Sequence, residues 1–402
     1  MNGLSSISTG FHILQSAPSR PIKSKHESSE DEDGAQQPAK FLRGNDNSKV
    51  VAAHYNELEE KGCEQRSKSR IVHMRNFNNW IKTMLINKYL TLIKSTQKLG
   101  DPLRVLDMCC GKGGDLIKWQ KNGITHLICT DIANVSVEQC KSRYTALMER
   151  MKRTNFAWNV TAEFFDCDST IARLRTLYKD PSIRLNLVSC QFAFHYCFES
   201  LSQAERMVQN AAECLKPGGF FIATIPDAYE IMKRQSEAQS KKFGNSIYEI
   251  EFICDTERPP LFGAKYKFHL EGVVDCPEFL VHFPTLVKLC RKYGLELVQK
   301  DGFADFYQKS LENDRDLLSR MQALETYPPP HGKKLSGDES DYAHAHKHLK
   351  DNSGSNTHRS KSIGTLSAPE WEAINLYLVC AFRKCEHELD SQGNPVYKWS
   401  SA

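Results

Sequence analysis

The chain has 402 residues, of which 40% are hydrophobic and 25% are charged, and it carries a formal net charge of +4. Its length suggests two or three domains, and no run of about 20 apolar residues is present that would span a membrane. The N-terminal segment lacks a basic start followed by a long apolar stretch, which argues against a signal peptide. The mild positive charge permits an anionic ligand without requiring one.

The cysteines are numerous but irregularly placed. All 14 occur without Cys-x-x-Cys pairs or regular spacing. In a chain without a signal peptide we expect them to be reduced, and we expect most of them to fill the core. The same lack of spacing argues against zinc, so the sequence predicts no metal site.

The N-terminal segment, residues 1–65, is polar and shows little apolar periodicity. It has too little apolar area to offset the entropy of ordering, so we predict a disordered regulatory tail. The acidic, serine-bearing run Glu27–Asp33 suggests phosphorylation, and Arg20–Lys25 resembles a weak nuclear signal.

Beyond the tail, helical and strand patterns alternate. Apolar residues recur at three- and four-residue steps over 70–95, which predicts a helix that ends before Gly100-Asp-Pro102. Strands are then expected at 104–108, 126–131, 163–168, 185–191 and 220–225, and helices at 116–119, 137–151 and 204–215. This rhythm predicts an α/β fold, a mostly parallel sheet with helices on both faces.

The C-terminal half is less regular. We expect an insertion at 227–276, a helix over 279–290, and late strands at 295–298 and 377–382. The polar stretch 330–365 is expected to be a flexible loop, and residues 387–402 a C-terminal tail. The sequence therefore predicts one domain at 66–386.

The segment Val105–Asp115 joins a strand to a helix through a glycine-rich turn. Glycine permits positive φ and lets a ligand approach the backbone closely. Asp131 ends the next strand, where an acidic residue would bind ribose hydroxyls. Neither a G-x-G-x-x-G nor a Walker pattern is present, which favours a ligand with a ribose but no pyrophosphate. S-adenosylmethionine fits this description.

Two further polar residues close predicted strands, Asp168 the third and Gln191 the fourth. The carboxyl ends of parallel strands meet at one edge, where ligands bind. A carboxylate at Asp168 would accept a hydrogen bond from the adenine amino group. The three polar strand ends together predict a nucleoside site.

Several longer motifs resemble those of one enzyme family. They lie at Asn76–Lys82, Leu106–Leu116, Cys129–Ala133, Cys190–Tyr196, Leu270–Asp275 and Tyr377–Val379. Together they resemble the vertebrate type of mRNA cap guanine-N7 methyltransferase over residues 65–385. The resemblance implies a Rossmann-like class I fold and methyl transfer from S-adenosylmethionine to N7 of the terminal guanosine of capped RNA, with S-adenosylhomocysteine as product. It also implies a nuclear enzyme that works with a small activating subunit and the transcription and capping machinery.

The resemblance assigns cofactor contacts position by position. Lys82 would hold the methionine carboxylate, Asp131 the ribose and Asp168 the adenine. The full set implied is Lys82, Cys109, Gly111, Asp131, Asp168, Gln191 and Tyr196. Cys109 departs from the family, which has glycine there, so its backbone contact is retained only if the position needs no positive φ.

The resemblance also assigns cap contacts. Asn78 and Asn79 would touch the cap, and Lys112, Lys118 and Arg143 would lie near its phosphates. His195, Glu271 and Tyr377 would hold the guanine: Glu271 would accept from N1–H and the amino group, His195 would donate to O6, and Tyr377 would stack. Guanine N7 has a lone pair and no proton, so no general base is expected and these three residues would act by positioning.

Two alternatives stay open on sequence grounds. A catalytically silent cap-binding module would keep the guanine pocket but lose the cofactor residues. Another S-adenosylmethionine-dependent methyltransferase would act on a small molecule, a protein or a ribose hydroxyl. A ribose hydroxyl must be deprotonated, and the sequence contains no compelling lysine-rich tetrad for that task.

Overall fold

The structure of the chain is a computed structural model that describes residues 46–57, 68–153, 160–312, 314–351 and 362–399. The acidic run Glu27–Asp33 and the basic segment Arg20–Lys25 lie outside these ranges. Within them, no helix combines the length and apolarity that crossing a membrane requires.

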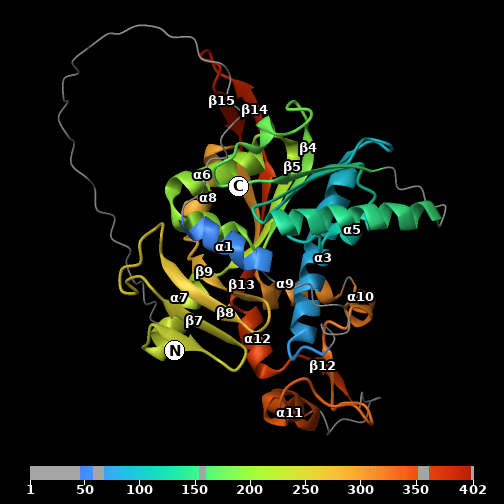
Figure 1. Cartoon of the computed structure of the whole chain (residues 1–402), viewed down its shortest axis with the longest axis vertical. Helices are drawn as coiled ribbons and strands as arrows, with labels where there is room; N and C mark the ends of the chain where they lie inside the picture. The colour runs from blue at the N-terminus through green and yellow to red at the C-terminus, as the bar shows by residue number, and fades with distance from the viewer. Residues whose placement is uncertain (1–45, 58–67, 154–159, 313, 352–361, 400–402) are drawn as a thin grey trace, which may run out of the picture. The chain divides into compact units, whose positions relative to one another are not determined.

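A seven-stranded sheet runs through the centre of the molecule (Figure 1). Its first five strands in the chain are parallel to one another, and its last strand in the chain, β13, pairs antiparallel with both of its neighbours, which confirms the predicted α/β class. In spatial order the strands are β10 (Leu295–Gly302), β13 (Tyr377–Lys384), β5 (Leu215–Pro226), β4 (Leu185–Gln191), β1 (Arg104–Met108), β2 (His126–Asp131) and β3 (Thr161–Asp166).

Helices cover both faces of this sheet because alternate side chains of each strand point to opposite sides. On β1, Val105 belongs to one hydrophobic core and Leu106 to the other. The first core is covered by α3 (Val72–Thr96), α4 (Leu116–Lys121), α5 (Asn134–Arg153) and α9 (Phe303–Leu311). The second is covered by η1 (Leu174–Thr176), η2 (Phe194–Glu199), α6 (Leu201–Ala212) and α8 (Phe283–Lys292).

The stretch 227–276, expected to be a less regular insertion, is more regular than expected. It holds one helix and most of a four-stranded antiparallel sheet, whose strands alternate buried and exposed residues. The elements are α7 (Ala228–Ala238), β6 (Lys242–Gly244), β7 (Tyr248–Phe252), β8 (Lys265–Leu270) and β9 (Val274–Phe279). The second sheet extends to Phe279, so its last strand leads directly into the segment before α8.

The remaining C-terminal part is also more regular than expected. The predicted loop 330–365 contains helices and one strand, although residues 352–361 lie outside the described ranges. The predicted tail contributes most of a hairpin whose Tyr397 packs over Gly294. The elements are α10 (Arg315–Arg320), β11 (Glu325–Tyr327), η3 (Glu339–Tyr342), α11 (Ala343–Asp351), β12 (Ile363–Thr365), α12 (Ala368–Ile374), β14 (Glu386–Leu389) and β15 (Pro395–Lys398).

Disorder was predicted for residues 1–65, and helix α1 (Asp46–Glu57) corrects this prediction for residues 46–57. Residues 1–45 and 58–65 lie outside the described ranges. The Val51 side chain of α1 is buried in the first hydrophobic core. The helix lies against α5 and β9, elements that are distant from it in the sequence (Figure 1). Burial of an apolar face against these elements supplies the stability that the polar composition did not suggest.

Candidate active site

A cavity of about 320 Å³ opens at the carboxyl ends of β1, β2 and β4. Every residue that the sequence assigned to the cofactor lines it. These residues are Lys82, Cys109, Gly111, Asp131, Asp168, Gln191 and Tyr196. The structure thus brings together side chains from five separate segments of the chain, as the parallel topology requires.

The glycine-rich turn is held to β2 by the Asp131 carboxylate. The Gly111 amide donates to Asp131 Oδ2 at 2.7 Å, and the Ala133 amide donates to Oδ1 at 2.9 Å. A Cβ on Gly113 would lie 2.8 Å from Cys140 Sγ, so this position must be glycine for the turn to pack on α5. Burial raises the pKa of Asp131, and the two amides partly oppose that shift.

Cys109 does not meet the condition under which its backbone contact was expected to be retained. Its φ is 59°, in the left-handed region that favours glycine. Phe192, directly after β4, has the same φ and also lines the cavity. Such conformations cost roughly 1–3 kcal/mol each and persist where the surroundings impose them. The turn therefore keeps its shape without the glycine, at an energetic cost.

Two cavity residues have polar atoms without a partner among the described residues. Asp168 lies two residues beyond the end of β3, a small correction to its expected place. Its Oδ1 accepts from the amide and hydroxyl of Thr170, whereas its Oδ2 is buried and unpaired. Gln191 Oε1 is likewise buried and unpaired. Buried acceptors in this state are costly, so they are suited to donors on a ligand.

Asp115, which the sequence analysis did not single out, directly precedes α4 and pairs with two lysines. Lys82 Nζ lies 2.9 Å and Lys118 Nζ 2.6 Å from Asp115 Oδ1. Lys118 also donates to Asn79 Oδ1 at 2.5 Å. Burial alone would raise the pKa of Asp115, but the two ammonium groups outweigh it and lower the pKa to about 2. Lys118 is therefore part of a buried ionic network, not a surface charge.

We expect Asp115→Asn to destabilise the protein by roughly 3 kcal/mol at neutral pH, because two largely buried ammonium groups lose their counter-charge. The folded-state pKa of Asp115, about 2, lies below its ordinary value, so its stabilisation is complete above about pH 4 and is lost as the pH falls toward 2. Thermal unfolding followed by circular dichroism at pH 7 and pH 3 measures both effects.

The matched control is Glu149→Gln, whose parent side chain is 60% exposed on α5. It should leave the unfolding temperature unchanged at both pH values. An equal loss of stability on acidification in Asp115→Asn and in the parent would contradict this role of Asp115.

Helix α1 forms one wall of the cavity. Asn47, Ser48, Val51 and Tyr55 all line it. The Tyr55 hydroxyl lies 3.2 Å from the Tyr196 hydroxyl, and Asn47 donates to Glu199 Oε1 at 2.6 Å. The sequence missed this wall, although the four-residue step from Val51 to Tyr55 is a helical signal. The expected tail therefore contributes part of the site.

A second cluster, of His195, Glu278 and Tyr377, adjoins the cavity. His195 Nε2 lies 3.2 Å from Glu278 Oε1, and the Tyr266 hydroxyl donates to Glu278 Oε2 at 2.8 Å. Burial and the charge of Glu278 raise the pKa of Tyr377. The cavity reaches the cluster through its lining residues: Tyr196 packs on His195, and Phe192 packs edge-on against Tyr377.

Glu271 was expected in this cluster, and the structure does not place it there. It is exposed in the turn between β8 and β9, whereas Glu278 lies at the opposite end of that hairpin, paired with Tyr266. Four residues of strand separate the two ends, roughly 13 Å. Glu271 instead borders a polar hollow on the second sheet. The signal that identifies Glu278 is an acidic residue on the buried face shared by Val274 and Cys276.

The chain matches the sequence model of the mRNA (guanine-N(7))-methyltransferase domain over residues 40–385. It is 60% identical to the mRNA cap guanine-N(7) methyltransferase of Drosophila melanogaster, over 88% of this chain and 81% of the relative. The corresponding proteins of Caenorhabditis elegans and Caenorhabditis briggsae are 41% and 39% identical, over 85% and 87% of this chain and 88% and 90% of theirs.

The chain belongs to the mRNA (guanine-N(7))-methyltransferase family. The family expected from the sequence motifs is confirmed, as are the S-adenosylmethionine-dependent methyltransferase class and its action on the guanine N7 of capped mRNA. The matched region begins at residue 40 and so includes α1, which the predicted domain boundary at residue 66 had excluded.

The remaining residues assigned to the cap, Asn78, Asn79, Lys112, Lys118 and Arg143, do not line the cavity. Asn79 and Lys118 are joined in the Asp115 network. The Arg143 guanidinium donates to the carbonyl oxygen of Lys112 at 2.8 Å, which places Arg143 beside the glycine turn that contains Lys112. Asn78 Oδ1 is buried without a partner among the described residues.

Proposed function

We propose that this methyltransferase holds S-adenosylmethionine in the cavity and the terminal guanosine of capped RNA against His195, Glu278 and Tyr377. The observation that carries the proposal is that the cavity and the cluster of His195, Glu278 and Tyr377 adjoin. Phe192 and Tyr196 line the cavity and contact Tyr377 and His195, so the two sites adjoin and cofactor and base would be held next to each other.

The donor set of the cavity fits the cofactor. Lys82 offers an ammonium group for the methionine carboxylate, Asp131 offers acceptors for ribose hydroxyls, and the unpaired Oδ2 of Asp168 suits the adenine amino group. Cys109, Gly111, Gln191 and Tyr196 complete the wall. When bound, S-adenosylmethionine supplies a methyl group activated by its sulfonium charge.

For the base, we assign to Glu278 the role that the sequence analysis gave to Glu271. Tyr266 occupies one acceptor site of Glu278 Oε2, and His195 Nε2 lies 3.2 Å from Oε1 without a hydrogen bond, so the carboxylate keeps acceptor sites for guanine N1–H and the 2-amino group. His195, whose Nδ1 is buried and unpaired, would donate to O6. Tyr377 would stack on the ring, which contributes about 1–3 kcal/mol.

The residues of the site act by alignment. Guanine N7 carries a lone pair and no proton, so displacement at the methyl group requires no general base. Fixing both reactants by buried contacts supplies effective molarity, which can contribute ~7–11 kcal/mol. The buried partners of Glu278 serve this purpose because they fix the orientation of its carboxylate.

The basic and amide residues beside the cavity are proposed to contact the rest of the cap. Lys112 and Arg143, which lie together beside the glycine turn, would meet the triphosphate bridge. Asn78 and Asn79 lie on the first turns of α3 with Lys82, on the side of the Asp115 network. Lys118 is proposed to act indirectly, since its ammonium group fixes Asn79 and Asp115.

Incubation with radiolabelled S-adenosylmethionine and unmethylated capped RNA tests the proposal. We expect label in the terminal guanosine, and nuclease digestion followed by chromatography should identify 7-methylguanosine. Label at a ribose hydroxyl or an internal base would contradict it, and absence of label with intact cofactor binding would favour the silent cap-binding alternative.

We further propose that the enzyme acts on nascent capped RNA in the nucleus, with a small activating subunit and the transcription and capping machinery. Membership of a family that acts on capped mRNA supports this context. Imaging of the tagged full-length chain tests the compartment, and affinity purification from nuclear extract with identification of bound proteins tests the partners. Exclusion from the nucleus would contradict it.

A further inference from the structure

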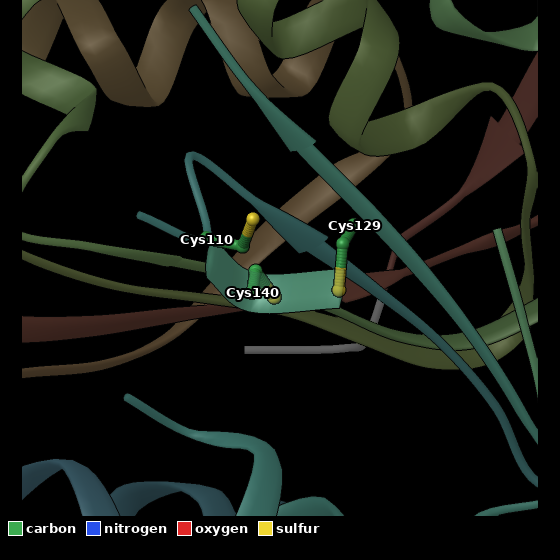
Figure 2. Close-up of side chains that lie close together, drawn as sticks. All are labelled: Cys110, Cys129 and Cys140. Carbon is green, nitrogen blue, oxygen red and sulfur yellow. The ribbon is translucent and has the colours of Figure 1, made fainter. Parts of the chain in front are cut away.

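We propose that Cys110, Cys129 and Cys140 form a binding site for a soft divalent cation, for which Zn²⁺ is the cellular ion. Their sulfur atoms all lie within 4.8 Å of one another, and Figure 2 shows the three side chains side by side. Among the described residues, no other group of three or more His, Cys, Asp or Glu side chains brings its ligand atoms together in a way that could hold a metal ion.

The three ligands come from three elements that build the cofactor cavity. Cys110 lies in the glycine-rich turn, Cys129 lies on β2 two residues before Asp131, and Cys140 lies on α5. They are far apart in the sequence, which is why spacing alone argued against a zinc site. A cation bound here would cross-link the turn, the strand and the helix.

The distances suit thiolate coordination. Zinc binds cysteine sulfur at about 2.3 Å in tetrahedral geometry, which places the sulfurs roughly 3.8 Å apart. Small side-chain rotations therefore close the group around an ion. Thiolates select soft cations over Mg²⁺ or Ca²⁺, and burial of Cys129 and Cys140 removes competing water.

Binding of a cation is coupled to the protonation of the three thiols. Hydrogen bonds with the Cys110 and Cys129 thiols, together with the Arg143 charge, lower the pKa of Cys140. The pKa of Cys110 and that of Cys129 are raised. The cysteines bind the cation as thiolates, so binding breaks the S–H bonds, releases the thiol protons to solvent and should strengthen with pH.

An entry route exists at Cys110. This residue is partly exposed and lines the cofactor cavity, whereas the other two cysteines are buried. A cation would approach from the cavity, and a water molecule there would take the fourth coordination position, as in zinc sites with three protein ligands. The site is separate from the methyl-transfer chemistry, which needs no metal.

Titration of the reduced full-length protein with Cd²⁺ tests the proposal, because thiolate–cadmium charge transfer absorbs in the ultraviolet. We expect one equivalent to bind tightly, with an amplitude that corresponds to three thiolates. Competition with a chelator of known affinity then gives the dissociation constant, and the same competition with Zn²⁺ gives the value for the cellular ion.

We expect Cys129→Ser and Cys140→Ser each to weaken binding by at least about 100-fold, as loss of one thiolate from three should. Cys110→Ser, at the partly exposed position, provides a third variant should the buried changes impair folding. Cys254→Ser, at a partly buried cysteine outside the cluster, should bind like the parent. Unchanged affinity in the three cluster variants, or no tight equivalent in the parent, would overturn the proposal.

Discussion

Glu278→Gln should lower kcat/KM for capped RNA by roughly 100-fold. The N1–H and 2-amino group of guanine lose a charged acceptor, and an amide takes its place. Hydrogen bonds to a charged group contribute about 1.5–3 kcal/mol each, so loss of one or two accounts for this factor. The remaining contacts of Glu278, to His195 and Tyr266, would also be weakened, which adds to the effect. Steady-state methylation assays with capped RNA measure it.

The matched control is Glu271→Gln, which makes the same chemical change at the exposed end of the β8–β9 hairpin. It should retain the activity of the parent. A cap with hypoxanthine, which lacks the 2-amino group, should be a poorer substrate than the guanine cap for the parent, and this preference should shrink in Glu278→Gln. The reverse pattern, with the large loss of activity in Glu271→Gln, would show that Glu271 binds guanine, as the sequence analysis expected, and would contradict the assignment to Glu278.

Asp131→Ala is expected to weaken S-adenosylhomocysteine binding by roughly 100-fold or more. The change removes the proposed ribose acceptor and also the bond from the Gly111 amide that holds the turn to β2. Two bonds to a buried carboxylate are each expected to contribute about 1.5–3 kcal/mol. Isothermal titration calorimetry measures the affinity directly, without dependence on turnover.

Asp166→Ala is the control for this experiment. Asp166 is paired in register with Asp131 on the neighbouring strand but is exposed and does not line the cavity. It should bind S-adenosylhomocysteine like the parent. If Asp131→Ala, with an unfolding temperature near that of the parent, bound the product equally well, the ribose assignment would be wrong.

The cofactor side of the site was accessible from the sequence because it depends on local patterns. Asp131 and Gln191 end strands that are recognisable by their apolar runs, and parallel topology brings the carboxyl ends of these strands to one edge. The glycine-rich turn after the first strand indicated where a ligand approaches the backbone. For these residues the structure supplies the contacts, such as the hydrogen bond from Gly111 to Asp131 and the ion pair of Lys82 with Asp115.

The guanine side was less accessible because it depends on register in the second sheet. Glu271 and Glu278 are both acidic residues in or beside one hairpin, and sequence similarity drew attention to the motif at 270–275. Which of the two faces His195 depends on how β9 pairs with β8 and which face it buries. A one-residue change in register would expose Glu278, so only the folded hairpin distinguishes them.

The sequence alone determined the α/β class, the order of the central strands along the chain and the polar residues at their ends. These follow from periodicity and turn chemistry, which act over a few residues. The folded structure alone decided that α1 covers the cavity, that Glu278 meets His195, and that Cys110, Cys129 and Cys140 converge. Each of these depends on packing between segments distant in the chain, and burial energy depends on which surfaces meet and not on local pattern.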